Sequence, residues 1–136
     1  MSDSTITVLV AGSGVMGKGI ALSFARAGLK TAILSRDPEA VSGVDAAVEG
    51  LGALPRAAPN LIVETIPEIM DLKLALNAQI EAAYQGATII ASNTSSLPLQ
   101  KLADALRYPG RYCGMHYFQP ADVTPIVEVA AVAQSD

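Results

Sequence analysis

The hydrophobic positions of the chain follow two periods that alternate along the sequence. Between short apolar runs, apolar residues recur every three or four positions over 15–27, 69–84 and 99–106, which predicts helices. A further short helix is expected from Pro38 to about Val48, since proline suits the first turn of a helix. Continuous β-branched runs are typical of strands buried on both faces, and they occupy residues 6–11, 31–34, 61–65, 88–92, 112–117 and 126–130. The alternation predicts an α/β fold with a doubly wound, mostly parallel sheet of the Rossmann type.

Composition narrows the class of protein. The 136 residues are 51% hydrophobic and 16% charged, which excludes disorder and suggests one domain over 1–136. The formal net charge of −4 and the lack of a basic block argue against nucleic acid as a partner. No apolar run is long enough for a membrane span, and the polar, acidic start at residues 1–4 is not a signal peptide, so we expect a cytoplasmic protein.

The scarcity of histidine and cysteine limits the chemistry. Cys113 is the single cysteine of the sequence, so it has no partner for an internal disulfide. His116 is the single histidine, which excludes a multi-histidine metal site, and we predict no metal. Any acid–base mechanism that uses histidine within this chain must use His116.

A glycine-rich turn joins the first predicted strand to the first predicted helix. The segment Gly12-Ser13-Gly14-Val15-Met16-Gly17 fits the pattern G-x-G-x-x-G. Within a βαβ unit, such a turn lets the backbone approach a pyrophosphate, and the helix N-terminus offers free N–H groups to it. We therefore expect a dinucleotide cofactor to contact Gly12, Gly14, Val15, Met16 and Gly17.

The end of the second strand bears on the choice between NADP and NAD. An acidic residue there usually bonds the 2′-hydroxyl of NAD, but this chain has Ser35 and Arg36. A small polar residue followed by arginine suits a 2′-phosphate, which favours NADP over NAD. The alternative, in which Arg36 is a solvated turn residue and Asp37 serves NAD, stays open.

Polar residues cluster where three predicted strands end. They fall in the segments 64–68 and 92–96 and at His116, and ligands bind at the carboxyl ends of parallel strands. Glu128 lies twelve residues after His116, on the next predicted strand, so the two side chains could meet. A carboxylate at one imidazole nitrogen would leave the other free to take a proton from a substrate hydroxyl. A histidine with a purely structural role fits the spacing equally well.

Four ordered blocks give the chain a family resemblance. They are residues 12–21, 92–97, 114–120 and 126–129, which include the motifs Ser92-Asn93-Thr94-Ser95-Ser96 and Met115-His116-Tyr117-Phe118-Gln119-Pro120. As a set they resemble the NAD-binding domain of the L-3-hydroxyacyl-CoA dehydrogenases. The resemblance implies reversible oxidation of a 3-hydroxyacyl thioester to its 3-keto form.

The resemblance also assigns roles to individual residues. It implies that His116 is the catalytic base, that Glu128 orients it, and that Ser95 contacts the substrate. It places Glu68 and Lys73 near the nicotinamide ribose, and we add Asn93 to the residues expected to bind the cofactor.

Some positions depart from the family pattern. Ser35 replaces the acid after the second strand, Gln119 replaces an asparagine, and the segment between residues 38 and 60 is shorter than the helical excursion that grips coenzyme A. A dehydrogenase of a small non-thioester hydroxy acid and a dinucleotide-binding module without catalysis therefore remain alternatives.

The family's helical C-terminal domain has no counterpart in these residues. Ser135 and Asp136 suit the N-cap of a helix that does not follow, and a cut at a domain edge is one interpretation. Apolar surface left without a partner domain predicts a homo-oligomer.

Overall fold

The computed structural model describes residues 5–48, 54–118, 121, 123–124 and 126–134. Several positions that the sequence singles out, namely Gln119, Pro120, Ser135 and Asp136, lie outside this part, as do residues 49–53 of the short segment between residues 38 and 60. The elements are β1 (Val8–Ala11), α1 (Val15–Arg26), β2 (Thr31–Leu34), η1 (Pro38–Ala40), β3 (Ala46–Val48), β4 (Leu61–Glu64), α2 (Met70–Tyr84), β5 (Ile89–Ser92), α3 (Leu99–Asp104), η3 (Pro109–Arg111), β6 (Tyr112–Tyr117) and β7 (Val127–Ala131).

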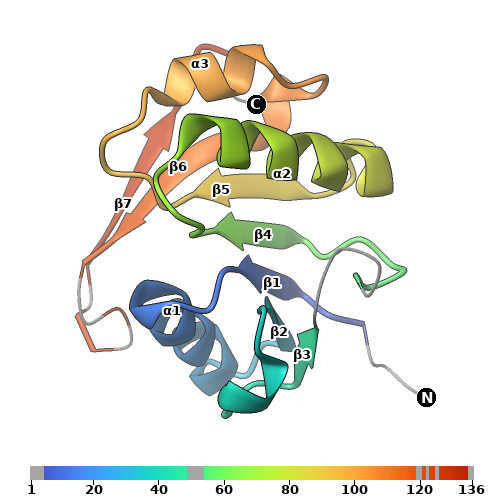
Figure 1. The fold of residues 1–136 in the computed structure, drawn as a ribbon, viewed down its shortest axis with the longest axis vertical. Coiled ribbons are helices and arrows are strands. Elements are labelled where there is room, and N and C mark those ends of the chain that lie inside the picture. Colours follow the sequence, from blue (N-terminus) through green and yellow to red (C-terminus); the bar gives the residue numbers. More distant parts are fainter. Residues whose placement is uncertain (1–4, 49–53, 119–120, 122, 125, 135–136) are drawn as a thin grey trace.

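The described strands form one sheet in the order β3-β2-β1-β4-β5-β6-β7 (Figure 1). Every pairing in it is parallel except the one between β6 and β7, so the predicted doubly wound, mostly parallel sheet is confirmed. The chain winds outward from β1 through β2 to β3 and then returns to β4, on the other side of β1. The carboxyl ends of β1 and β4 therefore border a switch point, which is where open α/β sheets bind ligands.

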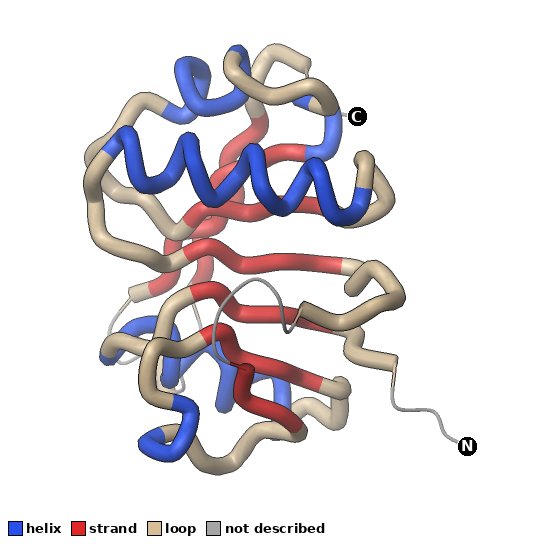
Figure 2. The backbone as a smooth tube through the Cα atoms, turned by 45° about the vertical axis from the view of Figure 1, so that its right-hand side comes forward, coloured by secondary structure: helices blue, strands red, loops and turns tan. Residues whose placement is uncertain are grey.

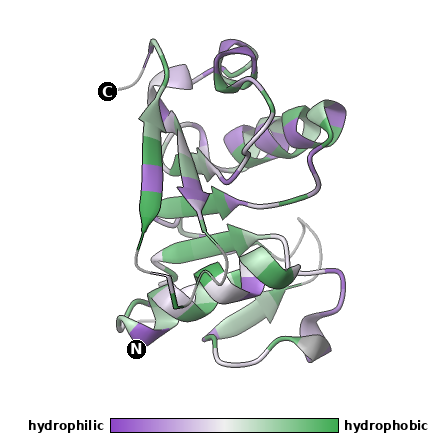
Figure 3. Ribbon diagram, turned by 90° about the vertical axis from the view of Figure 1, so that its left-hand side faces the viewer, coloured by the Kyte–Doolittle hydropathy of each residue, from purple (hydrophilic) through white to green (hydrophobic). Residues whose placement is uncertain are grey.

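Helices cover both faces of the sheet. Helix α1 lies on one face, and α2 and α3 lie on the other (Figures 1 and 2). Because side chains alternate along a strand, β1 buries Val8 and Val10 toward α1 but Leu9 and Ala11 toward α2 and α3. The central strands are correspondingly apolar over most of their length (Figure 3), as burial on both faces favours. The exceptions at their carboxyl ends are the buried Glu64 of β4 and Ser92 of β5.

The predicted helix from Pro38 to about Val48 is wrong. Only the single turn η1 forms, and the chain then becomes extended at Val41 and turns at Gly43, whose φ is +82°. Residues Ala46–Val48 instead pair with β2 as the parallel strand β3. The Asp45 carboxylate fixes the register, since it accepts a hydrogen bond of 2.8 Å from the Thr31 amide. This edge pairing outweighs the local helical preference.

Two charged residues lie on the buried face of α2. Lys73 and Glu81 are buried beside the apolar Leu76 and Ile80. The Glu81 carboxylate accepts hydrogen bonds of 2.9 Å from the Arg107 amide and 2.8 Å from the Tyr108 amide, and it thereby fixes the loop after α3. In the part of the chain described, no helix has both the length and the apolar character needed to cross a bilayer.

Candidate active site

The glycine turn between β1 and α1 has the geometry of a phosphate-binding loop. Gly12 has a φ of +118°, and a methyl group on Gly17 would lie 2.1 Å from the Gly12 carbonyl oxygen. Both positions therefore require glycine for the turn and for the close approach of α1. A methyl group on Gly14 would meet nothing within 4 Å, so the chain's own packing does not explain this glycine. The open space at Gly14 fits a site where a ligand approaches the backbone.

The start of α1 offers unpartnered donors to that space. Gly14 is the N-cap residue, no side chain caps the helix, and its first turn carries no acidic residue. The first N–H groups of a helix have no acceptor within it, and the helix dipole favours an anion there. These residues thus fit the pyrophosphate of a dinucleotide.

A cleft of about 1070 Å³ opens from this turn along the carboxyl ends of the parallel strands. It collects every predicted site residue except Glu128. Its lining comprises Gly12, Ser13, Gly14, Val15, Met16, Gly17, Leu34, Ser35, Arg36, Thr65, Ile66, Pro67, Glu68, Leu72, Lys73, Ala75, Leu76, Gln79, Asn93, Ser95, His116, Tyr117 and Phe118.

Sequence reasoning missed some of these lining residues. Thr65 and Ile66 lie inside the strand-end segment 64–68 noted in the sequence, although no individual role is assigned to them there. Leu72, Leu76 and Gln79 lie on α2, and nothing in the helical pattern separates a cleft-facing position from a core position.

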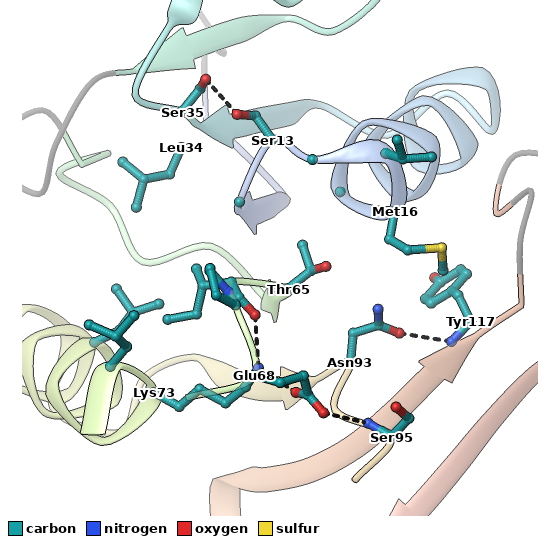
Figure 4. Close-up of a pocket in the computed structure, with 18 of the residues that line it drawn as sticks. Ser13, Met16, Leu34, Ser35, Thr65, Glu68, Lys73, Asn93, Ser95 and Tyr117 are labelled. Carbon is teal, nitrogen blue, oxygen red and sulfur yellow. Dashed lines mark hydrogen bonds and ion pairs between the residues drawn. The ribbon is translucent and has the colours of Figure 1, made fainter. Parts of the chain in front are cut away.

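Ser35 links the end of β2 to the glycine turn. Its hydroxyl donates a hydrogen bond of 2.7 Å to the Ser13 hydroxyl and accepts one of 3.0 Å from the Asp37 amide (Figure 4). Ser35 is buried, whereas the neighbouring Arg36 is exposed. This edge of the cleft therefore presents a neutral hydroxyl pair and an arginine.

Glu68 organises the loop that follows β5. Its carboxylate accepts hydrogen bonds from the hydroxyls of Thr94 and Ser96, both at 2.8 Å, and from the amides of Ser95 and Ser96, both at 3.2 Å. Lys73 adds an ion pair at 3.3 Å. Partial burial raises the pKa of Glu68, but these contacts outweigh it and lower the pKa to about 2. The loop with Ser95 is thus held by the ionised carboxylate of Glu68 against the segment that precedes α2 (Figure 4).

Asn93 connects the same loop to β6. Its side-chain oxygen accepts a hydrogen bond of 2.9 Å from the Tyr117 amide, next to His116 (Figure 4). Because both Asn93 and His116 line the cleft, this bond fixes the spacing between the loop after β5 and the end of β6.

His116 and Glu128 occupy opposed positions in the antiparallel ladder of β6 and β7. Directly opposed residues extend their side chains to the same side of a sheet, as the predicted dyad requires. The imidazole is half-buried and packs edge-on against the Phe118 ring, with 4.9 Å between centroids. Glu128 is exposed and does not line the cleft, and no hydrogen bond joins it to His116 in the described structure. The dyad stays a prediction.

No group of three or more histidine, cysteine, aspartate or glutamate side chains gathers in a metal-binding arrangement among the described residues. Cys113 is a half-buried free thiol on β6, and burial raises its pKa.

Comparison with known families gives a match over nearly the whole chain. The model of the NAD binding domain of 3-hydroxyacyl-CoA dehydrogenase matches residues 7–58 and 53–136. The two matched parts overlap over residues 53–58, in the segment before β4, where the sequence is shorter than the family pattern.

Two curated relatives differ in their names. A 5-formyl-3-hydroxy-2-methylpyridine 4-carboxylate 5-dehydrogenase from Mesorhizobium japonicum is 30% identical over 91% of this chain and 48% of its own. The fatty acid oxidation complex subunit alpha from Pseudomonas paraeruginosa is 35% identical over 88% of this chain and 20% of its own. The chain thus spans about half the length, or less, of these relatives. Both alignments run over 148 residues, more than the chain's 136, so the relatives contain residues without a counterpart here.

Solved structures agree in fold. A 5-formyl-3-hydroxy-2-methylpyridine 4-carboxylic acid 5-dehydrogenase, described as an NAD+ dependent dismutase, superposes with a TM-score of 0.85 at 26% identity, covering 97% of this chain and 51% of that one. A 3-hydroxybutyryl-CoA dehydrogenase from Escherichia coli gives a TM-score of 0.83 at 28% identity, covering 96% of this chain and 33% of that one.

Proposed function

Because the chain belongs to the family of 3-hydroxyacyl-CoA dehydrogenase NAD-binding domains, we propose that it is the coenzyme-binding and proton-transferring part of an oxidoreductase. The reaction is the interconversion of a 3-hydroxyacyl thioester, or a related 3-hydroxy compound, and its 3-keto form. The observation that supports it is that the glycine turn, Asn93, Ser95 and His116 line one cleft.

The dinucleotide would be held at the glycine turn. The open space at Gly14 and the uncapped amides of Val15 and Met16 suit its pyrophosphate. When bound, the nicotinamide ring supplies the hydride acceptor for oxidation and the hydride donor for reduction. Asn93 and Glu68 lie farther along the cleft, where they suit the nicotinamide half of the cofactor. Lys73, which is 1% exposed, would act there through its ion pair with Glu68.

The proton step belongs to His116. During oxidation, the C3–H bond breaks with its electron pair, the O–H bond releases its proton to the imidazole, and the C3–O bond becomes a carbonyl. The Ser95 amide donates to Glu68, which fixes the backbone of this residue at the cleft. Because Ser95 is exposed in the cleft, its side chain would hold the substrate oxygen. Glu128 would stabilise the imidazolium from β7 once the side chains turn toward each other.

Substitution of His116 tests this function. We expect His116→Gln, in the protein that carries this chain, to lower hydride transfer from the reduced cofactor to a 3-ketoacyl thioester about 10²–10⁴-fold, with dinucleotide affinity retained. Met115→Leu is the matched control, because Met115 lies on the same strand outside the cleft lining. Unchanged hydride transfer in His116→Gln contradicts the proton role. Cofactor binding without turnover by the unaltered protein supports a non-catalytic module instead.

A second substrate class has specific support. The Mesorhizobium japonicum relative is named for a pyridine carboxylate, which is not a thioester, and the segment that would grip coenzyme A is short here. A small non-thioester hydroxy acid is therefore the second candidate. Turnover of a 3-ketoacyl thioester and of its free acid should be compared. A higher kcat/KM for the free acid overturns the thioester assignment and supports this candidate.

We also propose a cytoplasmic homo-oligomer. Val123, Ile126 and Val129, near or on the edge strand β7, are 71%, 59% and 67% exposed, and an apolar strand edge favours association. Sedimentation analysis should show a complex of two or more copies that Val129→Glu weakens. A monomer at high concentration contradicts the oligomer, and recovery in a membrane or secreted fraction contradicts the location.

A further inference from the structure

We propose that this chain binds NADP(H) in preference to NAD(H), and that Arg36 holds the 2′-phosphate of the adenosine ribose. The inference rests on the proposed function, because it concerns the dinucleotide taken by the same cleft. It starts from three consecutive residues at the end of β2, namely Ser35, Arg36 and Asp37.

Ser35 makes the end of β2 neutral. An NAD site typically places a carboxylate here, where it accepts hydrogen bonds from the ribose diol and would repel a 2′-phosphate. The Ser35 hydroxyl is buried at 4% exposure and is engaged twice, with Ser13 at 2.7 Å and with the Asp37 amide at 3.0 Å. These bonds pin the end of β2 to the glycine turn without adding negative charge, so a phosphate can approach.

Arg36 provides a free cation at that place. Its side chain is exposed and lines the cleft beside Ser35 and the glycine turn. Among the described residues, no hydrogen bond or ion pair occupies its guanidinium. A guanidinium binds phosphate oxygens through paired, charge-assisted hydrogen bonds, and no competing carboxylate must first be displaced.

The acidic residues nearby do not offset this charge. Asp37 does not line the cleft, although its backbone amide contacts Ser35. This placement disfavours the alternative in which Asp37 serves the diol of NAD. Glu68 is the acidic residue among the described lining residues, but it lies across the cleft from Ser35 and is engaged by the loop after β5 and by Lys73 (Figure 4). Among the described lining residues, Arg36 is therefore the charged side chain at the adenosine end of the cleft.

The preference would set this chain apart within its family. The family model is described as NAD binding, and a structurally similar dehydrogenase is described as NAD+ dependent. The shared glycine turn explains binding of either dinucleotide, because the pyrophosphate is common to both. Only the 2′-position differs between them, and that difference would be read by Ser35 and Arg36.

Calorimetric titration with NADP+ and NAD+ tests the preference without requiring turnover. We expect the unaltered chain to bind NADP+ at least about tenfold more tightly, as one charge-assisted contact implies. Arg36→Ala should reduce affinity for NADP+ about tenfold and leave affinity for NAD+ within about twofold. Arg107→Ala, which removes the same charge outside the cleft lining, should change neither. The fragment 2′,5′-ADP, which carries the 2′-phosphate, should likewise bind more tightly than 5′-AMP, which lacks it. Arg36→Ala should weaken binding of 2′,5′-ADP and leave binding of 5′-AMP nearly unchanged.

A charge introduced at Ser35 gives an independent test. Ser35→Asp should lower affinity for NADP+ and raise affinity for NAD+, while a circular dichroism spectrum reports whether the variant folds. Equal or tighter binding of NAD+ by the unaltered chain overturns the preference but leaves the proposed function standing. Absence of binding by either dinucleotide overturns the proposed function itself. An NADP+ affinity unaffected by Arg36→Ala overturns the role of Arg36.

Discussion

The ammonium group of Lys73 and the carboxylate of Glu64 form an ion pair that is almost completely removed from water. Lys73 is 1% exposed and Glu64 is 0% exposed. Glu64 also accepts hydrogen bonds from the Ser92 hydroxyl and, at 2.9 Å, from the Ile66 amide. Lys73 further donates to the Ile66 carbonyl at 3.2 Å and approaches Glu68. The pair thus joins the ends of β4 and β5 to α2, directly beneath the cleft.

Loss of either partner of this pair is expected to destabilise the protein strongly. Lys73→Met leaves the buried Glu64 carboxylate without its cation, and breaking a buried pair costs about 3–5 kcal/mol. Urea denaturation should show this loss in the free energy of unfolding, together with a lower midpoint.

The double variant and a surface control separate pairing from burial. Glu64→Leu combined with Lys73→Met removes both charges and should be less destabilising than Lys73→Met alone. Lys101→Met changes an exposed lysine of α3 and should shift the free energy of unfolding by less than about 0.5 kcal/mol. A loss in Lys73→Met no larger than in Lys101→Met contradicts the buried-pair account.

The sheet and the cleft could be predicted because their determinants are local. The runs at 6–11 and 31–34 are short, apolar and β-branched, and the glycine turn carries its conformational requirement in three residues. The place of Lys73 could not be predicted in this way. A lysine on a helix is ordinarily solvated, and its burial depends on Glu64, which reaches it from β4 only in the folded sheet.

Strand β3 shows the same limit. Residues 46–48 are two alanines and a valine, and their extended conformation depends on pairing with β2 and on the contact between Asp45 and Thr31. For His116 and Glu128, the backbone register could be predicted but the side-chain contact could not. Their opposed register followed from sequence spacing, but whether the side chains meet depends on rotamers and neighbours that spacing does not determine.

The depressed pKa of Glu68 predicts a pH-dependent contribution to stability. Because the pKa in the folded protein, about 2, lies below its ordinary value of 4.5, the contribution is present above pH 4.5 and is lost as the pH falls toward 2. Glu68→Gln should therefore destabilise the protein near neutral pH, and the difference from the unaltered protein should shrink between pH 4.5 and 2. Thermal unfolding over that range measures the difference. The effect will be modest, since Glu68 is partly exposed to solvent.

Glu39→Gln is the matched control for this pH profile. Glu39 lies in η1, and none of the hydrogen bonds described for Glu68 has a counterpart there. The melting temperature of Glu39→Gln should therefore stay close to that of the unaltered protein at each pH. The stability difference between Glu68→Gln and the unaltered protein should not be constant from pH 4.5 to 2, and it should not grow as the pH falls. Either result contradicts the account in which the ionised Glu68 carboxylate holds the loop after β5.

Two glycine substitutions distinguish folding from ligand binding in the turn after β1. Gly17→Ala places a methyl group 2.1 Å from the Gly12 carbonyl oxygen, so α1 must move and the melting temperature should fall. Gly14→Ala meets no protein atom within 4 Å and has an extended backbone with a φ of −69°, so the protein should fold with nearly unchanged stability. Its methyl group would instead occupy space that a pyrophosphate needs, and dinucleotide affinity should fall at least about tenfold.

The control for both glycine variants is Ala27→Ser, which changes a residue at the end of α1 with ordinary helical geometry. Gly28→Ala is unsuitable as a control because the φ of Gly28 is +90°. Thermal melts combined with calorimetric titration measure both quantities, and a Gly14→Ala variant that binds the dinucleotide as tightly as the unaltered protein contradicts the location of the phosphate site.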